Sequence, residues 1–144
     1  MEKIIKQLSV LGVAGAMALT LGCDLDVEDP HHLAGFAPDS VDGKTGTATV
    51  TGGTGDAAAT GSFTITFTST AYSLTDTGGT MGDDTGTYTY TRQGPNTGLI
   101  QKTSADGDAG NLTAIFPSET AGTYSYVSTA GDAATQTGNI TIPE

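Results

Sequence analysis

The sequence has no tryptophan, a single cysteine and only five basic residues among its 144. One cysteine cannot form a disulfide within the chain, so the fold must be stable without that cross-link. Because tryptophan is absent and aromatic residues make up only 6% of the chain, the core must be built from alternating Phe, Tyr, Ile, Leu and Val. Sixteen acidic residues give a net charge of −11, which disfavours nucleic acid and anionic lipid head groups as partners.

The sequence also lacks a recognisable catalytic set. Its two histidines, His31 and His32, are adjacent and would point to opposite sides of an extended chain. Two solvated histidines are therefore favoured over a metal site. A Ser-His-Asp triad would have to take its histidine base from the same acidic, flexible segment, which disfavours a triad. No glycine-rich loop opens onto a helix, because no stretch has a helical period. We expect a protein that is not an enzyme and that has no cofactor.

Residues 1–22 have the order of a secretory signal peptide. Lys3 and Lys6 precede an uncharged apolar run that begins at Leu8 and ends at Gly22. This run of 15 residues is shorter than the roughly 20 that a transmembrane helix needs. A cleaved leader is therefore favoured over a permanent membrane span.

The leader ends in Thr20-Leu21-Gly22-Cys23, which resembles the lipobox of bacterial lipoproteins. The resemblance implies that Cys23 receives a diacylglyceryl group and acyl chains such as palmitate, and that it becomes the first residue of the mature protein. A three-chain anchor is sufficient for stable membrane attachment. The expected location is the bacterial cell envelope, at the outer membrane or the periplasmic face of the inner membrane. The alternative is an unpaired thiol after an ordinary signal peptide.

After the leader, we expect two segments. Residues 23–43 contain the lipidated cysteine and an acidic, proline-containing stretch with little periodicity, which predicts a flexible tether. Residues 44–144 are long enough for one small β-domain. Without residues 1–22 the chain keeps 15 acidic and three basic residues, a net charge of −12.

From residue 44 onward, apolar and polar residues alternate with a period of two. This period predicts β-strands at residues 45–51, 62–69, 71–77, 85–92, 98–104, 111–117, 122–128 and 137–143. In the second of these, Phe63, Ile65 and Phe67 share one face, and threonines occupy the other. Threonine keeps the strand conformation and remains wettable on the outer face.

Short turns rich in Gly, Asn and Asp separate the predicted strands. Short connections join neighbouring antiparallel strands, so the sequence predicts an all-β, up-and-down meander. Eight such strands can close into a small barrel, which removes exposed sheet edges. A two-layer β-sandwich is the alternative.

Several segments carry a resemblance to a known group. GSFTITFTS at 61–69, GTYTYTRQGPNTG at 86–98 and LTAIFPSETAGTYSY at 112–126 are similar to a Thr/Gly-rich β-repeat family of uncharacterised bacterial secreted proteins and lipoproteins. The resemblance covers nearly the whole β-domain and implies a β-rich fold, but no activity. A more remote resemblance is to calycin or lipocalin-type barrels, although their Gly-x-Trp signature is missing.

Two kinds of binding site remain as candidates. Asp106, Asp108 and Asn111 resemble a fragment of a calcium loop, but Pro117 stands where a complete loop would need a bidentate acid. Turn formation is therefore favoured over a metal site. Alternatively, a barrel interior could hold one apolar molecule, lined by Phe63, Phe67, Tyr88, Tyr90, Phe116 and Tyr124.

The leading functional prediction is a non-catalytic envelope lipoprotein that acts as a surface or periplasmic binding or structural module. Its partners would be the membrane, through the anchor, and an envelope protein or a small apolar ligand. The alternatives are a small-molecule carrier of lipocalin-like type and a calcium-stabilised adhesion module.

Overall fold

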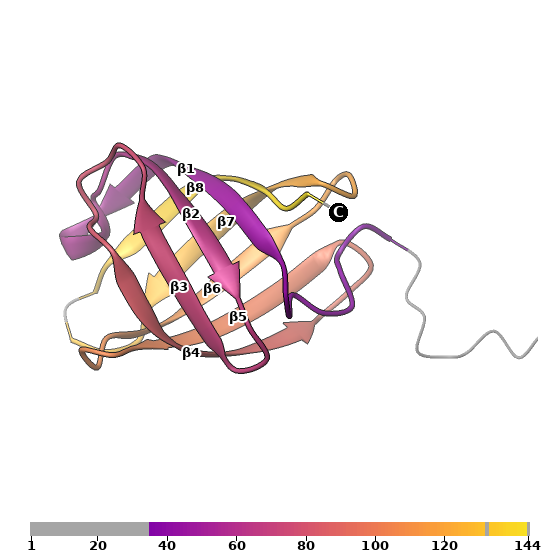
Figure 1. Cartoon of the computed structure of the whole chain (residues 1–144). Coiled ribbons are helices and arrows are strands. Elements are labelled where there is room, and N and C mark those ends of the chain that lie inside the picture. Colours follow the sequence, from indigo (N-terminus) through magenta and orange to yellow (C-terminus); the bar gives the residue numbers. More distant parts are fainter. Residues whose placement is uncertain (1–34, 132, 144) are drawn as a thin grey trace, which may run out of the picture. The chain divides into compact units, whose positions relative to one another are not determined.

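A computed structural model describes residues 35–131 and 133–143. Within these ranges the chain forms eight antiparallel strands and one short 3₁₀ helix (Figure 1). The strands are β1 (Thr45–Thr54), β2 (Gly61–Phe67), β3 (Ala71–Asp76), β4 (Asp84–Arg92), β5 (Thr97–Ser104), β6 (Ala109–Ile115), β7 (Ala121–Ser128) and β8 (Thr135–Thr141), with helix η1 (Gly55–Ala57) after β1.

Each strand pairs with the next in sequence, and β8 pairs with β1. The sheet therefore closes into an up-and-down barrel with no free edge. The predicted all-β meander and its barrel form are confirmed, and the two-layer sandwich is wrong. All eight predicted strands are present, with ends that differ by a few residues.

The largest change in a strand end is in β1, which continues to Thr54 instead of ending at residue 51. Its pairing with β8 shifts between Val50 and Gly52, so Thr51 is a bulge residue. A bulge bends the strand and increases its twist. The three extra residues lead directly into η1 at one end of the barrel.

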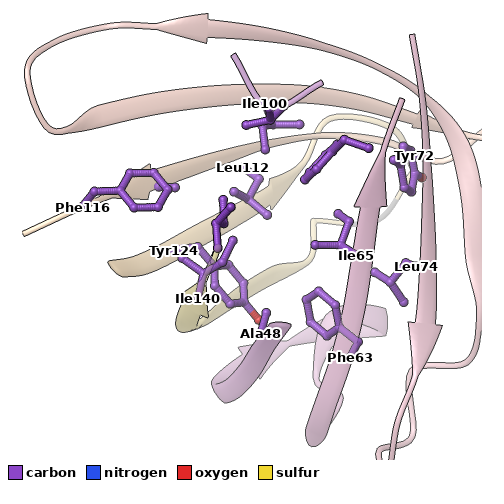
Figure 2. Close-up of a cluster of buried hydrophobic side chains, with 14 of the residues drawn as sticks. Ala48, Phe63, Ile65, Tyr72, Leu74, Ile100, Leu112, Phe116, Tyr124 and Ile140 are labelled. Atoms are coloured by element: carbon purple, nitrogen blue, oxygen red, sulfur yellow. The ribbon is translucent and has the colours of Figure 1, made fainter. Parts of the chain in front are cut away.

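The alternation places apolar side chains inside the barrel and threonines outside, as predicted. Phe63, Ile65 and Phe67 are all buried, whereas the outer face of β1 is exposed. Rows of hydroxyls link neighbouring strands on the outside, as between Thr45 and Thr66, whose oxygens are 3.1 Å apart. Figure 2 shows the buried side chains converging from several strands on one core.

Residues 35–43 close one end of the barrel. Val41 is only 1% exposed and Ala37 only 3%, and the Gly43 N–H donates to the Phe67 carbonyl at 3.1 Å. Figure 1 shows this indigo segment at the end of the barrel where the C-terminus lies, with η1 at the opposite end. We call residues 35–43 the plug segment.

The plug segment was predicted to belong to the tether, and this part of the prediction is wrong. The compact unit that contains the barrel begins at Ala34. The apolar residues of the plug segment are few and lack a strand period, so local sequence does not predict that Ala37 and Val41 pack inside the barrel. The remaining tether prediction lies outside the described residues, as do His31, His32 and Cys23.

Polar contacts fix the plug segment to the barrel. The Tyr90 hydroxyl donates to the Pro38 carbonyl at 2.6 Å, and the Asn96 side chain accepts from the Phe36 N–H at 3.0 Å. Arg92 pairs with Asp39 at 2.5 Å. Burial raises the pKa of Tyr90 to about 12, with a further increase from Asp39 that Arg92 opposes. The hydroxyl therefore stays protonated as a donor.

Candidate functional site

A cavity of about 520 Å³ opens at the end of the barrel opposite the plug segment. Its mouth is formed by the connections β1–β2, β3–β4, β5–β6 and β7–β8, all of which lie at this end. Its deeper wall contains the buried side chains of Phe63, Ile65, Leu74 and Leu112. The volume is within the range of about 300–1,000 Å³ that is typical of small-molecule sites.

The interior is thus divided into a packed end and a hollow end. The largest fully buried side chains, Phe67, Phe116 and Val41, are at the plugged end and do not line the cavity. Phe67 also packs edge-on against Tyr88, with ring centroids 4.9 Å apart. The plug segment contributes the buried Val41 side chain to this end, and within residues 35–131 and 133–143 the other end retains the cavity.

The predicted apolar lining is therefore mostly wrong. Of the six residues expected to line a ligand site, only Phe63 lines the cavity. Tyr90 and Tyr124 pack with the core, and the Tyr124 hydroxyl donates to the Gln136 side chain at 2.9 Å. The alternation correctly indicated which side chains face the barrel interior. It could not indicate which of them line a cavity, because the plug segment fills one end of the barrel.

Four polar side chains lie together in the cavity wall: Tyr72, Asp84, Lys102 and Ser104. We call them the wall cluster. The Asp84 carboxylate accepts from the Tyr72 hydroxyl, the Lys102 ammonium and the Ser104 hydroxyl, each at 2.7 Å. The Lys102 ammonium also donates to the Tyr72 hydroxyl oxygen at 3.3 Å.

The strand register brings the wall cluster together. Ser104 pairs with Gly86, two residues after Asp84, so these two side chains share the inner face of β4 and β5. A Cβ on Gly86 would be 2.0 Å from the Thr103 carbonyl oxygen. Only glycine allows β4 and β5 to approach this closely at the cluster.

Two aromatic rings flank the Lys102 ammonium. Its nitrogen is 5.3 Å from the centroid of the Tyr72 ring and 5.4 Å from that of Tyr126. Both distances are within the range of cation–π attraction. The lysine and Asp84 side chains are 19% and 23% exposed, so the pair is sheltered but reachable from the cavity.

The environment of the wall cluster fixes its protonation. Burial opposes the charge of Asp84, but hydrogen bonds from Lys102, Tyr72 and Ser104 outweigh it and lower the pKa of that carboxyl. Burial and the Asp84 hydrogen bond raise the pKa of Tyr72 well above its ordinary value. At neutral pH Asp84 is therefore a carboxylate and Tyr72 a neutral hydroxyl, which suits hydrogen bonding better than proton transfer.

The β3–β4 connection, which carries Met81 and Asp83 to the mouth, is held by one carboxylate. Asp76 accepts from four backbone N–H groups, those of Gly78, Gly79, Met81 and Gly82, at 2.6–3.1 Å. These bonds, with that of Gly78 the largest contribution, lower the pKa of Asp76. The connection therefore has a defined shape without regular secondary structure.

The structure separates the three residues of the possible calcium loop. Asp106 and Asp108 line the cavity mouth, whereas Asn111 lies on the outer face of β6 beside a shallow surface hollow of about 460 Å³. Asp83 also lines the mouth, and its carboxylate accepts from the Asp76 N–H at 2.9 Å. Within residues 35–131 and 133–143, no group of three His, Cys, Asp or Glu side chains is placed to hold a metal ion.

The sequence reasoning did not find the wall cluster. One signal was available: Lys102 is two residues after the buried Ile100 on β5 and therefore shares its inner face, and an inward lysine in a strand needs a partner. Its partner Asp84 lies just before the strand predicted at residues 85–92. Recognising the pair required the register between β4 and β5, which the sequence does not state.

Comparisons with protein-family models, with curated proteins and with solved structures found no match to this chain. Of the residues that the structure describes, none form a helix with the length and apolar character of a membrane span. The site must therefore be interpreted from its own geometry.

Proposed function

We propose that this protein is a non-catalytic binding module of the bacterial cell envelope whose barrel holds one small, largely apolar molecule. The observation that carries the proposal is the cavity of about 520 Å³, which is open at one end and has an apolar deeper wall. An apolar wall with a few convergent polar groups is the usual form of a small-molecule site, and here the exposed aspartates of the lining are at the mouth. Of the functions considered from the sequence, the carrier is the one that this geometry favours.

The closed end supports the same proposal. The plug segment fills the barrel at the end where the chain enters it, so a ligand would enter and leave only through the opposite mouth. A barrel that served purely as a rigid support would gain stability from filling both ends, because empty volume in a core is destabilising.

Native mass spectrometry of the mature protein, purified gently from its cell envelope, tests the proposal. We expect a discrete additional mass on the folded protein that disappears on denaturation. Leu112→Phe adds volume inside the cavity and should reduce the bound fraction, whereas Val127→Phe adds the same ring on the exposed outer face and should not. A wild-type protein without additional mass that also fails to bind any added apolar probe would contradict the proposal.

Attachment to the membrane through Cys23 is a separate part of the proposal, supported by the lipobox-like sequence and the absence of a second cysteine. Metabolic labelling with a clickable fatty acid should modify the wild-type protein and leave Cys23→Ser unlabelled. If the wild-type protein takes up no label, the anchor is wrong, whatever the barrel binds.

A further inference from the structure

The wall cluster has no net charge and incomplete hydrogen bonding. Asp84 Oδ2 accepts two hydrogen bonds, but Oδ1 accepts only one, from Ser104. A carboxylate oxygen can accept about two. Lys102 has three N–H groups, and it donates to Asp84 and to Tyr72. Among the described residues, the cluster thus leaves one donor and one acceptor unused.

We propose that the cavity takes an uncharged lipophile whose hydroxyl group binds the wall cluster. This inference rests on the proposed function. A hydroxyl accepts one hydrogen bond, here from Lys102, and donates one, here to Asp84 Oδ1. The apolar part of the molecule then contacts Phe63, Ile65, Leu74 and Leu112, which line the same cavity.

A carboxylate head group fits the cluster less well. It could accept from Lys102, but it has no proton to donate to Asp84 Oδ1, and it would place a second negative charge beside that oxygen. Asp56, Asp106 and Asp108 at the mouth add only a weak repulsion, because they are exposed to water and screened by salt. An anionic lipophile is therefore disfavoured mainly by the wall.

An ammonium head group has the opposite defect. It could donate to Asp84 Oδ1, but it offers no lone pair to Lys102, and the two positive charges would repel each other in the sheltered wall. The aspartates at the mouth attract a cation, but Asp56, Asp106 and Asp108 are exposed to water, where salt screens their effect. The partly buried wall cluster should therefore decide the preference.

The test uses the full mature protein and three ligands with the same chain: decan-1-ol, decanoate and decylamine. The measurement is displacement of the neutral fluorescent probe N-phenyl-1-naphthylamine by each ligand at pH 8, where decanoate and decylamine are charged. We expect decan-1-ol to bind at least about tenfold more tightly than either charged analogue, because each charged head group leaves one polar partner in the wall without a hydrogen bond. If decanoate or decylamine binds as tightly as the alcohol, the inference is overturned and the cavity proposal stands.

A paired substitution tests the wall cluster itself. Asp84→Asn combined with Lys102→Met removes both charges together, so no buried charge is left without a partner. The ratio of decan-1-ol affinity to probe affinity should fall about fivefold to tenfold, whereas Gln101→Ala, on the outer face of the same strand, should leave it unchanged. An unchanged ratio in a folded double variant overturns the inference. If the double variant does not fold, the comparison of the three ligands on the wild-type protein still decides.

If neither the probe nor any decyl ligand binds, the proposed function itself fails. This outcome is distinct from binding without the expected preference, which rejects only the hydroxyl head group.

Discussion

Several tyrosine rings inside the barrel lie on glycines of a neighbouring strand. A Cβ at Gly98 would be 2.6 Å from the Tyr90 ring, and one at Gly110 would be 2.2 Å from that of Tyr126. Gly138 is covered in the same way by Tyr124. The inward glycines therefore leave space for tyrosine rings from the neighbouring strand. A barrel of this small size can contain the rings because these glycines have no side chain.

Gly138→Ala tests this arrangement. The new methyl group would be 2.3 Å from the Thr49 carbonyl oxygen and 2.5 Å from the Tyr124 ring, and a buried ring has little room to move. We expect a loss of about 1–3 kcal/mol in the free energy of unfolding, as is typical for overpacking. Urea denaturation measures it, with Gly94→Ala as the control, because nothing lies within 4 Å of that position. Equal losses in both variants would contradict the steric explanation.

The wall cluster predicts a specific response to acid. Because the pKa of Asp84 is lower in the folded protein, its contribution to stability is present above the ordinary aspartate pKa near 4 and is lost as pH falls through the folded value. Asp84→Asn should cost roughly 1–3 kcal/mol at pH 7 and progressively less as the pH falls below about 4.

Urea midpoints measured from pH 7 to pH 2 check this prediction. Asp106→Asn is the control, since it removes a carboxylate from an exposed turn and none of the bonds to Asp84. If the difference in urea midpoint between wild type and Asp84→Asn stays constant over this pH range, the carboxylate charge does not contribute to the stability of the cluster.

At the scale of elements, the sequence predicted the strands well and the plug segment not at all. The alternation of Phe63, Ile65 and Phe67 with threonines has only one structural interpretation, and short turns leave each strand little choice of neighbour. The plug segment has no such pattern. Its burial depends on a barrel end that exists only after the strands have paired, so it could not be inferred from local sequence.

The contribution of the plug segment can be measured through Val41. Its side chain is 1% exposed, so Val41→Ala should leave a small cavity and cost about 1–3 kcal/mol in the free energy of unfolding. Asp42→Asn, at an exposed neighbouring position, should cost much less. Thermal or urea unfolding provides the comparison, and a neutral Val41→Ala would contradict the structural role of this segment.

At the scale of the whole molecule, the two ends of the barrel have different roles. One end is packed with Phe67, Phe116 and Val41, and the other contains the cavity and the wall cluster. The all-β meander followed from eight strands and short connections, whereas the sequence favoured the barrel but left a two-layer sandwich as the alternative. The position of the cavity did not, because it depends on the plug segment and on the pairing of β4 with β5.

The most direct test of ligand binding in the open end is an NMR titration of methyl-labelled protein with N-phenyl-1-naphthylamine. The methyl resonances of Ile65, Leu74 and Leu112, which line the cavity, should shift as the probe is added. Those of Val41 and Ile142, which are buried in the core but do not line the cavity, should change little. Shifts confined to outer-face residues such as Val127, or no shifts at all, would contradict the account.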